Sequence, residues 1–177
     1  MNATQKLFEW DGTYTRDNRG AVLFEAVMRE LRDRTWDELV PDDTANMGDR
    51  VPLPADMMIM ALARDSTNLW WDDRRTANTR ETRDDVVGAA LAAGYRATRA
   101  RHGEPSGDGW RWDRIRFANI RHSLGLPALS ALDIPVQGGP STLAPFDGSG
   151  RFGASWRMVV ELAPTPRAWT IYPGGQS

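Results

Sequence analysis

Gly153–Leu162, which reads Gly-Ala-Ser-Trp-Arg-Met-Val-Val-Glu-Leu, is followed after five residues by Ala168–Ser177, which reads Ala-Trp-Thr-Ile-Tyr-Pro-Gly-Gly-Gln-Ser. The first segment alternates with the period of an extended strand. The side chains on one of its faces are Trp156, Met158, Val160 and Leu162. The connection 163–167 holds two prolines, which cannot continue a strand ladder. We therefore predict a β-hairpin whose first strand is buried on at least one side.

The bulk composition fits one ordinary globular domain. The chain has 177 residues, of which 41% are hydrophobic and 26% charged. Its formal net charge is −2, so no overall positive field attracts a nucleic acid or an anionic membrane. Residues 1–6 have no apolar segment of the kind a signal peptide needs, and no window approaches eighteen apolar residues, so we expect neither a signal peptide nor a membrane span.

The cysteine and histidine content limits which catalytic and metal-binding sites the chain can form. The sequence has no cysteine, which excludes disulfides, thiolate nucleophiles and zinc sites built on cysteine. Its two histidines, His102 and His122, do not share a metal-binding spacing, so a histidine metal centre would need added carboxylates. We therefore expect no cofactor from these residues.

Three segments have helical periodicity. Gly20 to about Thr35 repeats its apolar residues at helical spacing, and a second helix is expected from Pro54 to about Arg64, with its methionines filling the core. The third is expected from Thr79 to about Arg101. Asn78 and Glu81 form its predicted capping box, and Gly103 ends it. The predicted apolar face of this helix comprises Val86, Val87, Ala90, Leu91 and Tyr95.

From Trp110 onward the sequence changes to aromatic and β-branched runs interrupted by Gly and Pro. Helices followed by strands predict an α+β fold, with helices in residues 20–101 and mostly antiparallel strands in 110–172. No linker divides the chain convincingly. We therefore expect a single domain over 1–177, in which residues 1–103 are helical and residues 110–177 are rich in strands.

Conventional catalytic motifs are missing, including the nucleophile elbow, the phosphate-binding loop and the zinc-protease helix. The paired carboxylates Asp72–Asp73 and Asp84–Asp85 have the chemistry to ligate calcium or magnesium. For Asp84–Asp85 the simpler interpretation is charge compensation in the first turn of a helix. His122 and Ser123 are neighbours on an extended segment and point to opposite faces, so a structural role for His122 is favoured over activation of the serine.

Arginines alternate with aromatic residues between Trp110 and Arg121, a pattern that single-strand nucleic-acid binders also show. The arginines are at positions 111, 114, 116 and 121. Acidic residues elsewhere balance this charge, so nucleic-acid binding is a distant alternative.

Seven short motifs then occur in an order typical of one known family. These are Trp10–Gly12 before the Leu23–Glu25 helix, Trp71–Asp73 with Glu81–Asp85, Trp110–Trp112, Ile120–Leu124, Gly138–Thr142, Gly153–Glu161 and Pro173–Ser177. In this order they resemble the C-terminal part of the β-subunit in the penicillin amidase (penicillin acylase) family of N-terminal-nucleophile hydrolases.

The resemblance implies a partial αββα sandwich from a precursor that cleaves itself into two chains. It also implies hydrolysis of the amide bond in N-acyl compounds, such as β-lactam antibiotics, acyl-homoserine lactones or lipopeptides. The nucleophile would be the serine at the new β-subunit N-terminus, with its own α-amino group as base. An asparagine would stabilise the oxyanion. Relatives of this kind are usually periplasmic or secreted and often carry a structural calcium, whose ligands are not identifiable in this sequence.

None of that machinery matches a position here, so we expect the chain to be a segment truncated at both ends, with no catalytic residue of its own. Ser66–Trp70 echoes a mature β-subunit start, but Asp65 stands where glycine is expected before the cut. Glu161 is the one supporting candidate, as a carboxylate that orients a catalytic group. The competing interpretation is a strand-edge charge bonded to an arginine. The expected partners are the upstream β-subunit and α-subunit of the same precursor, and the alternative is an inactive structural or partner-binding piece.

Overall fold

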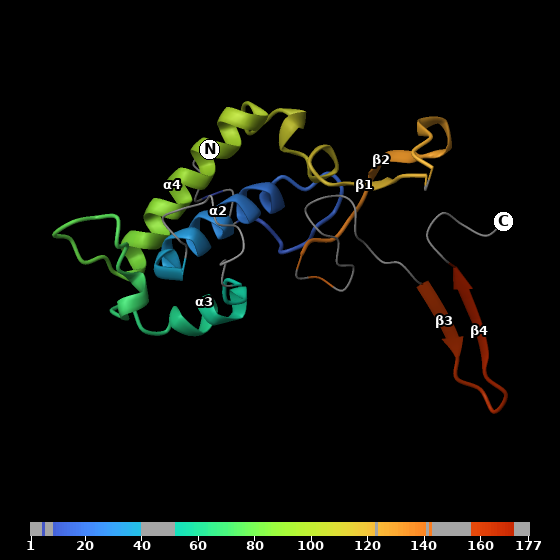
Figure 1. The fold of residues 1–177 in the computed structure, drawn as a ribbon, viewed down its shortest axis with the longest axis horizontal. Helices are drawn as coiled ribbons and strands as arrows, with labels where there is room; N and C mark the ends of the chain where they lie inside the picture. The colour runs from blue at the N-terminus through green and yellow to red at the C-terminus, as the bar shows by residue number, and fades with distance from the viewer. Residues whose placement is uncertain are drawn as a thin grey trace. The chain divides into compact units, whose positions relative to one another are not determined.

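The computed structural model describes residues 5, 9–39, 52–122, 124–140, 142 and 157–171, with only the backbone at 157 and 171 (Figure 1). Over these residues the fold is α+β, as predicted, with three helices and two small antiparallel sheets. The chain divides into two compact units. The first comprises Met1–Trp10 with Gly20–Pro105, and the second Asp11–Arg19 with Ser106–Ser177. Among the described helices, none has the length and apolarity needed to cross a bilayer.

The first long helix, α2, spans Gly20–Thr35, which confirms the predicted range. Its buried face includes Leu23, Val27 and Leu31, at the helical spacing seen in the sequence. Trp10 packs against Phe24 with ring centroids 4.6 Å apart. The helix therefore begins against the indole of Trp10 and buries its apolar stripe in the first unit.

The second long helix, α4, spans Arg83–His102 and packs against α2. The predicted start at Thr79 is wrong, because the capping box is Thr82 with Asp85, not Asn78 with Glu81. Asn78 has a φ of 66°, outside the extended conformation of a helix cap. Gly103 ends the helix as predicted, with a φ of 78°.

The buried face of α4 is also narrower than predicted. Its buried residues are Val86, Ala90, Gly94 and Thr98. Val87, which was expected in this face, is exposed. Small residues replace large ones because the two helices approach closely. A Cβ on Gly94 would lie 2.9 Å from the backbone nitrogen of Val27.

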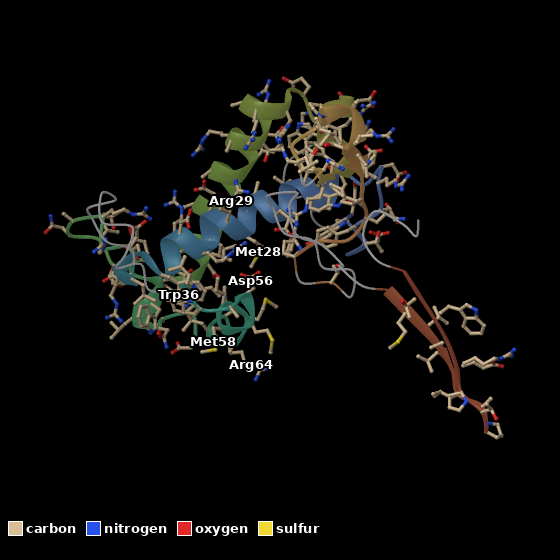
Figure 2. All side chains as sticks on the ribbon, turned by 45° about the vertical axis from the view of Figure 1, so that its right-hand side comes forward. Met28, Arg29, Trp36, Asp56, Met58 and Arg64 are labelled. Carbon is tan, nitrogen blue, oxygen red and sulfur yellow. The ribbon has the colours of Figure 1, made fainter. Side chains whose placement is uncertain are left out.

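The short helix α3 spans Asp56–Leu62, so it begins two residues after Pro54, with Ala55 as its N-cap. The prediction that its methionines fill the core is wrong. Ile59 is its one buried residue, whereas Met57 and Met60 are 81% and 67% exposed. Figure 2 shows Met58 on the side of α3 turned away from α2. Two helical turns bury only one side, and Asp56 fixes that side through an ion pair to Arg32 at 3.1 Å.

Short 3-10 turns connect these helices within the first unit. They are η1 at Asp37–Leu39 and η3 at Leu69–Trp71. Trp71 is fully buried, and its indole nitrogen donates to the carbonyl of Asp65 at 2.8 Å. Trp36 and Trp70 meet edge to face with centroids 5.2 Å apart. These indoles hold the loop segments onto the helices.

The longer segment of the second unit, Ser106–Ser177, starts with two 3-10 turns, η4 at Asp108–Trp110 and η5 at Trp112–Arg114. Strand β1, Phe117–Ile120, then pairs antiparallel with β2, Ala131–Pro135, in the register Phe117↔Pro135. The turn η6, Pro127–Leu129, lies between them. Every residue of β2 is exposed, so among the described residues of this unit the large buried side chains are mainly the indoles of the 3-10 turns.

The C-terminal hairpin pairs β3, Arg157–Glu161, with β4, Arg167–Ile171, in the register Val159↔Trp169 (Figure 1). This confirms the predicted hairpin, and residues 153–156 and 172–177 lie outside the described residues. The predicted burial is wrong. Met158 and Val160 on one face, and Val159 and Trp169 on the other, are all exposed. A two-stranded ribbon has no second layer of its own to cover either face.

Candidate functional site

Glu161 lies at the last position of β3, directly opposite Arg167 of β4. The guanidinium of Arg167 contacts Glu161 Oε2 through Nε at 2.8 Å and through Nη2 at 2.7 Å. Arg167 also stacks over the Trp169 ring, 5.8 Å from its centroid. Glu161 thus has the arginine partner of the competing interpretation, and its role in orienting a catalytic group stays a prediction.

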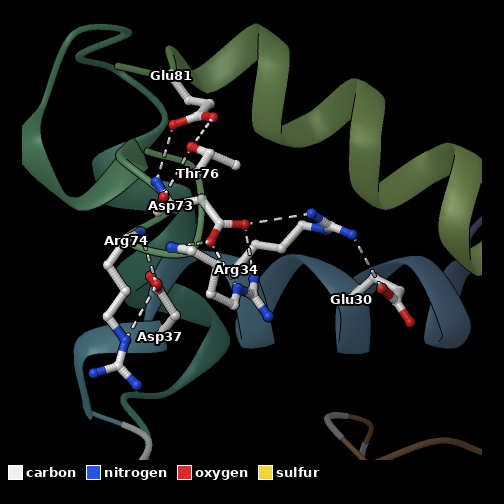
Figure 3. Close-up of polar contacts among 8 residues, drawn as sticks. Glu30, Arg34, Asp37, Asp73, Arg74, Thr76 and Glu81 are labelled. Carbon is white, nitrogen blue, oxygen red and sulfur yellow. Dashed lines mark hydrogen bonds and ion pairs between the residues drawn. The ribbon is translucent and has the colours of Figure 1, made fainter. Parts of the chain in front are cut away.

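A charged cluster at the C-terminal end of α2 is the most extensive polar arrangement among the described residues of the first unit (Figure 3). Its centre is Asp73, whose side chain is only 6% exposed. Arg75 binds both oxygens of this carboxylate, with Nε–Oδ1 at 2.6 Å and Nη2–Oδ2 at 2.8 Å, and Arg34 approaches Oδ2 at 3.4 Å. The hydrogen bonds from Arg75 lower the pKa of Asp73, so this carboxylate stays ionised at neutral pH and is a poor general base.

Two further contacts complete the cluster. Asp37, buried after the end of α2, accepts a hydrogen bond from the backbone nitrogen of Arg74 at 2.9 Å. Glu81 accepts from the backbone nitrogen of Asp73 at 3.2 Å and from the hydroxyl of Thr76 at 2.5 Å. Figure 3 shows these side chains bridging α2, the loop after η3 and the approach to α4. The arrangement fixes a loop between two helices.

The carboxylates of Asp84 and Asp85, which were considered as metal ligands, have different partners in the structure. Asp84 binds the guanidinium of the adjacent Arg83, and Asp85 accepts from the backbone nitrogen and hydroxyl of Thr82. The bonds from Thr82 lower the pKa of Asp85. Among the described residues, no group of three or more acidic or histidine side chains could hold a metal ion. The helix-start interpretation of Asp84 and Asp85 therefore agrees with their contacts.

The serine of the segment Ser66–Trp70 lies within a tight turn. Asp65 accepts from the backbone nitrogen and hydroxyl of Thr67, both at 3.1 Å, and from the Asn68 amide at 3.2 Å. The bond from the Thr67 backbone is the main reason why the pKa of Asp65 is lowered. The Ser66 carbonyl accepts from the backbone nitrogen of Arg83 at 3.0 Å. Both neighbours of the serine are thus used to anchor the turn near the start of α4.

His122 has a local structural contact. Its Nδ1 accepts from the backbone nitrogen of Leu124 at 3.3 Å, and its own backbone nitrogen donates to the Ser130 hydroxyl at 3.0 Å. Ser123 lies outside the described residues, so the separation of His122 from this serine stays a prediction.

The arginine and aromatic segment after residue 110 does not present its indoles to solvent. Trp110 is fully buried and Trp112 is 2% exposed, so neither ring is accessible for stacking on a base. Arg111 is held by a bidentate contact to Asp113 at 3.0 and 2.8 Å, which lowers the pKa of the Asp113 carboxyl. Arg116 lies over the Trp112 ring at 5.6 Å. These contacts argue against a nucleic-acid surface here.

Three segments far apart in the sequence meet around Trp112 within the second unit. The indole nitrogen of Trp112 donates to the carbonyl of Gly138 at 3.0 Å, and its ring meets Tyr14 edge to face at 5.0 Å. The backbone nitrogen of Gly138 donates to the carbonyl of Tyr14 at 3.1 Å. A Cβ on Gly139 would lie 2.6 Å from the Tyr14 ring, so a larger residue at this position would have to displace that ring. Sequence reasoning missed Tyr14; the paired glycines Gly138 and Gly139 are the sequence signal that could have indicated a close backbone approach at this point.

A search of curated proteins finds no relative that matches the sequence. The family model described as penicillin amidase matches residues 1–177, the whole length of the chain. Three of the seven motifs that suggested this resemblance form the anchoring contacts described above, namely Trp71–Asp73 with Glu81–Asp85, Trp110–Trp112, and the Gly138–Gly139 part of Gly138–Thr142. The chain therefore belongs to the penicillin amidase family.

Proposed function

We propose that this chain supplies a portion of the β-subunit scaffold of an amidohydrolase that cleaves the amide bond of N-acyl compounds. The nucleophilic serine and the oxyanion asparagine come from another region of the same precursor. Membership of the family supports an amide-hydrolysing activity of the N-terminal-nucleophile type. The acyl compounds in question are β-lactam antibiotics, acyl-homoserine lactones or lipopeptides.

The observation that carries this proposal is how the motif residues are used. Trp71, Trp110 and Trp112 are buried, the indoles of Trp71 and Trp112 donate to backbone carbonyls, and Thr82 caps α4. Side chains that are committed to such contacts position a framework and are not available to attack a substrate. The motifs of the family in this chain thus support a role in holding an active site, with the reacting groups elsewhere.

Glu161 is the residue that we propose to act on the active site from this scaffold. Its Oε2 is held by Arg167, which fixes the orientation of the carboxylate at the end of β3. A carboxylate fixed in this way can accept a hydrogen bond from a protonated ring nitrogen and set the tautomer of that ring. In this role Glu161 would be a positioning residue.

Turnover measured with and without the upstream sequence tests the main proposal. Residues 1–177 are assayed alone and then joined to the segment encoded upstream, with phenylacetyl and fatty-acyl nitroanilides as substrates. We expect no turnover by 1–177 alone and measurable turnover by the joined protein. Replacing the upstream serine with alanine should abolish this turnover. Turnover by residues 1–177 alone would overturn the proposal.

The same experiment distinguishes the main proposal from the alternative, in which the chain is an inactive structural or partner-binding piece. That alternative predicts a joined protein that folds and binds its partner chain but hydrolyses neither substrate.

For Glu161, the pH profile of kcat is compared between Glu161→Gln and Arg167→Gln in the active assembly. We expect a shifted pH profile for Glu161→Gln and a smaller shift for Arg167→Gln, which removes only the group that orients the carboxylate. A Glu161→Gln profile equal to that of the natural sequence would contradict the positioning role.

A further inference from the structure

The solvent side of α3 carries a row of methionines that ends at an arginine. Met57, Met60 and Arg64 follow the i, i+3 and i+7 spacing of one helical face, with Arg64 in the turn after α3, and Met58 flanks this row. We infer that this methionine face, defined by Met57, Met58 and Met60, binds an acidic amphipathic helix from another region of the same precursor. The inference rests on the proposed function, because it assigns one contact between this scaffold and the remainder of the enzyme.

The methionine face is exposed, whereas the opposite side of the same helix is buried. Its three side chains are between 55% and 81% exposed, while Ile59 is 2% exposed. The ion pair between Asp56 and Arg32 of α2 fixes this orientation, so the methionines stay directed away from the core. Methionine side chains are flexible and polarisable, and they are common on surfaces that receive an amphipathic helix. An exposed apolar patch of this composition is therefore typical of an interaction site.

Positive charge at both ends of the methionine face indicates an acidic partner. Arg64 follows the last turn of α3, and Arg29 lies one helical turn before Arg32, on the side of α2 that contacts α3 (Figure 2). Arg29 and Arg64 are exposed, and within the described part of the chain neither guanidinium has a hydrogen bond or an ion pair. The carboxylates that border α3 are occupied, because Asp56 pairs with Arg32 and Asp65 accepts hydrogen bonds within its own turn. Carboxylates of a partner are therefore the groups that complement these two arginines.

The shape of this surface favours a helix as the partner. The described residues of the first unit form helices and 3-10 turns, so they offer no strand edge that an extended segment could join. A row of side chains at helical spacing packs into the groove between the rows of another helix. From Met57 to Arg64 the chain rises by about 10 Å, at roughly 1.5 Å per residue. A partner helix with carboxylates about two turns apart therefore matches a cation at each end of the methionine face.

Methionine oxidation in the joined protein tests this contact without relying on turnover. Hydrogen peroxide is added to the folded protein and to the same protein in urea, and the sulfoxide at each methionine is measured by mass spectrometry. We expect the three methionines of α3 to react at least about tenfold more slowly in the folded protein, because the partner helix covers them. Met28, which is buried in α2, is the internal standard for full protection.

Charge reversal at Arg64 tests the acidic character of the partner. Arg64→Glu in the joined protein should make the three methionines at least about threefold more reactive than in the natural sequence, because it repels the carboxylates of the partner helix. Arg96→Glu is the matched control and should leave their reactivity unchanged. Arg96 is also an exposed helical arginine without an ion pair in the described part of the chain, but it lies on α4.

Arg64→Lys identifies the partner segment. A carbodiimide joins a lysine amine to a neighbouring carboxylate as an amide with loss of water. The amine introduced at this position should link to an Asp or Glu outside residues 1–177 of the same precursor molecule, and peptide mapping locates that carboxylate. The natural sequence, treated in the same way, should give no link at this position.

The outcomes separate this inference from the proposed activity. A joined protein that is inactive but shows the protection and the cross-link supports the helix contact and contradicts the activity alone. Three results would overturn the inference. These are methionines of α3 that react as fast as in urea, protection that Arg64→Glu leaves unchanged, and an Arg64→Lys variant that links to no carboxylate or only to a second molecule.

Discussion

Substitution of Gly94 by alanine tests the close approach of α2 and α4. The added methyl would lie 2.9 Å from the backbone nitrogen and 3.0 Å from the Cα of Val27. Both distances are shorter than side-chain carbons normally reach, and backbone atoms cannot rotate away. The two helices must therefore separate, which costs about 1–3 kcal/mol for overpacking of this kind.

A gain in helix propensity offsets some of this cost. Alanine is favoured over glycine inside a helix by about 0.8–1.0 kcal/mol. The net effect of Gly94→Ala is thus a loss of up to about 2 kcal/mol. Gly88 provides a matched control, because it lies in the same helix, is exposed and has no atom within 4 Å of its added methyl. Gly88→Ala should gain stability of about 0.8–1.0 kcal/mol.

The measurable quantity is the difference between the two variants, in which helix propensity cancels. We expect Gly94→Ala to be less stable than Gly88→Ala by about 1–3 kcal/mol in urea denaturation followed by far-ultraviolet circular dichroism. Thermal melts should differ by roughly 2–12 °C, at about 2–4 °C per kcal/mol for a chain of this size. Equal stabilities, or a more stable Gly94→Ala, would refute the packing of α4 on α2 at this point.

Three other predictions concern the anchoring contacts. Thr82→Ala removes the cap of α4 and should cost about 1 kcal/mol in urea denaturation, whereas Thr82→Ser should cost less. Asp73→Asn weakens the contacts with Arg75 and should cost about 1.5–3 kcal/mol at pH 7. Because the pKa of Asp73 is lowered on folding, its contribution is present above the unfolded value of 3.8 and is lost as the pH falls from there through the folded pKa. The free energy of unfolding should therefore fall less steeply with decreasing pH in Asp73→Asn than in the natural sequence. The same steepness in both proteins would contradict the ion pair. Gly139→Ala should destabilise the second unit by about 1–3 kcal/mol, and most of this loss should disappear when Tyr14→Ala removes the ring that the methyl meets.

The helix α2 was predicted from Gly20 to about Thr35 by its apolar spacing, and other local features of the sequence agree with that range. Gly20 precedes the apolar repeat, the repeat keeps one face, and Arg32 and Arg34 lie in the last turn, where cations favour the helix dipole. The α+β class followed from the order of helices and strands. Local signals of this kind are sufficient when tertiary contacts do not compete with them.

At α4 two capping patterns compete in the sequence. Asn78 with Glu81 and Thr82 with Asp85 both satisfy the spacing of a capping box. The structure uses the second, because Glu81 is engaged by the backbone of Asp73 and the hydroxyl of Thr76. Those contacts depend on the conformation of a loop, which the spacing of residues in the sequence does not reveal. The start of the helix was therefore decided by partners that sequence spacing cannot identify.

The anchoring residues show the same limit. Tyr14 has no motif of its own, yet it contacts Trp112 and closes over Gly139. Asp37 had no assigned role, yet it is buried and holds the backbone of Arg74. Each becomes recognisable only when segments distant in sequence lie side by side. The glycines and tryptophans of the motifs could be recognised in the sequence, whereas the residues that they contact could not.

The hairpin shows why alternation predicts faces and not burial. The alternation of side chains between the two faces follows from a period of two, whereas the register Val159↔Trp169 is set by the turn that joins the strands. Burial, however, depends on a second surface, and apolar side chains on both faces of β3 and β4 are exposed. A strand that is apolar on both faces is typical of the interior of a larger sheet. We therefore expect another part of the same precursor to cover the exposed apolar side chains of this hairpin.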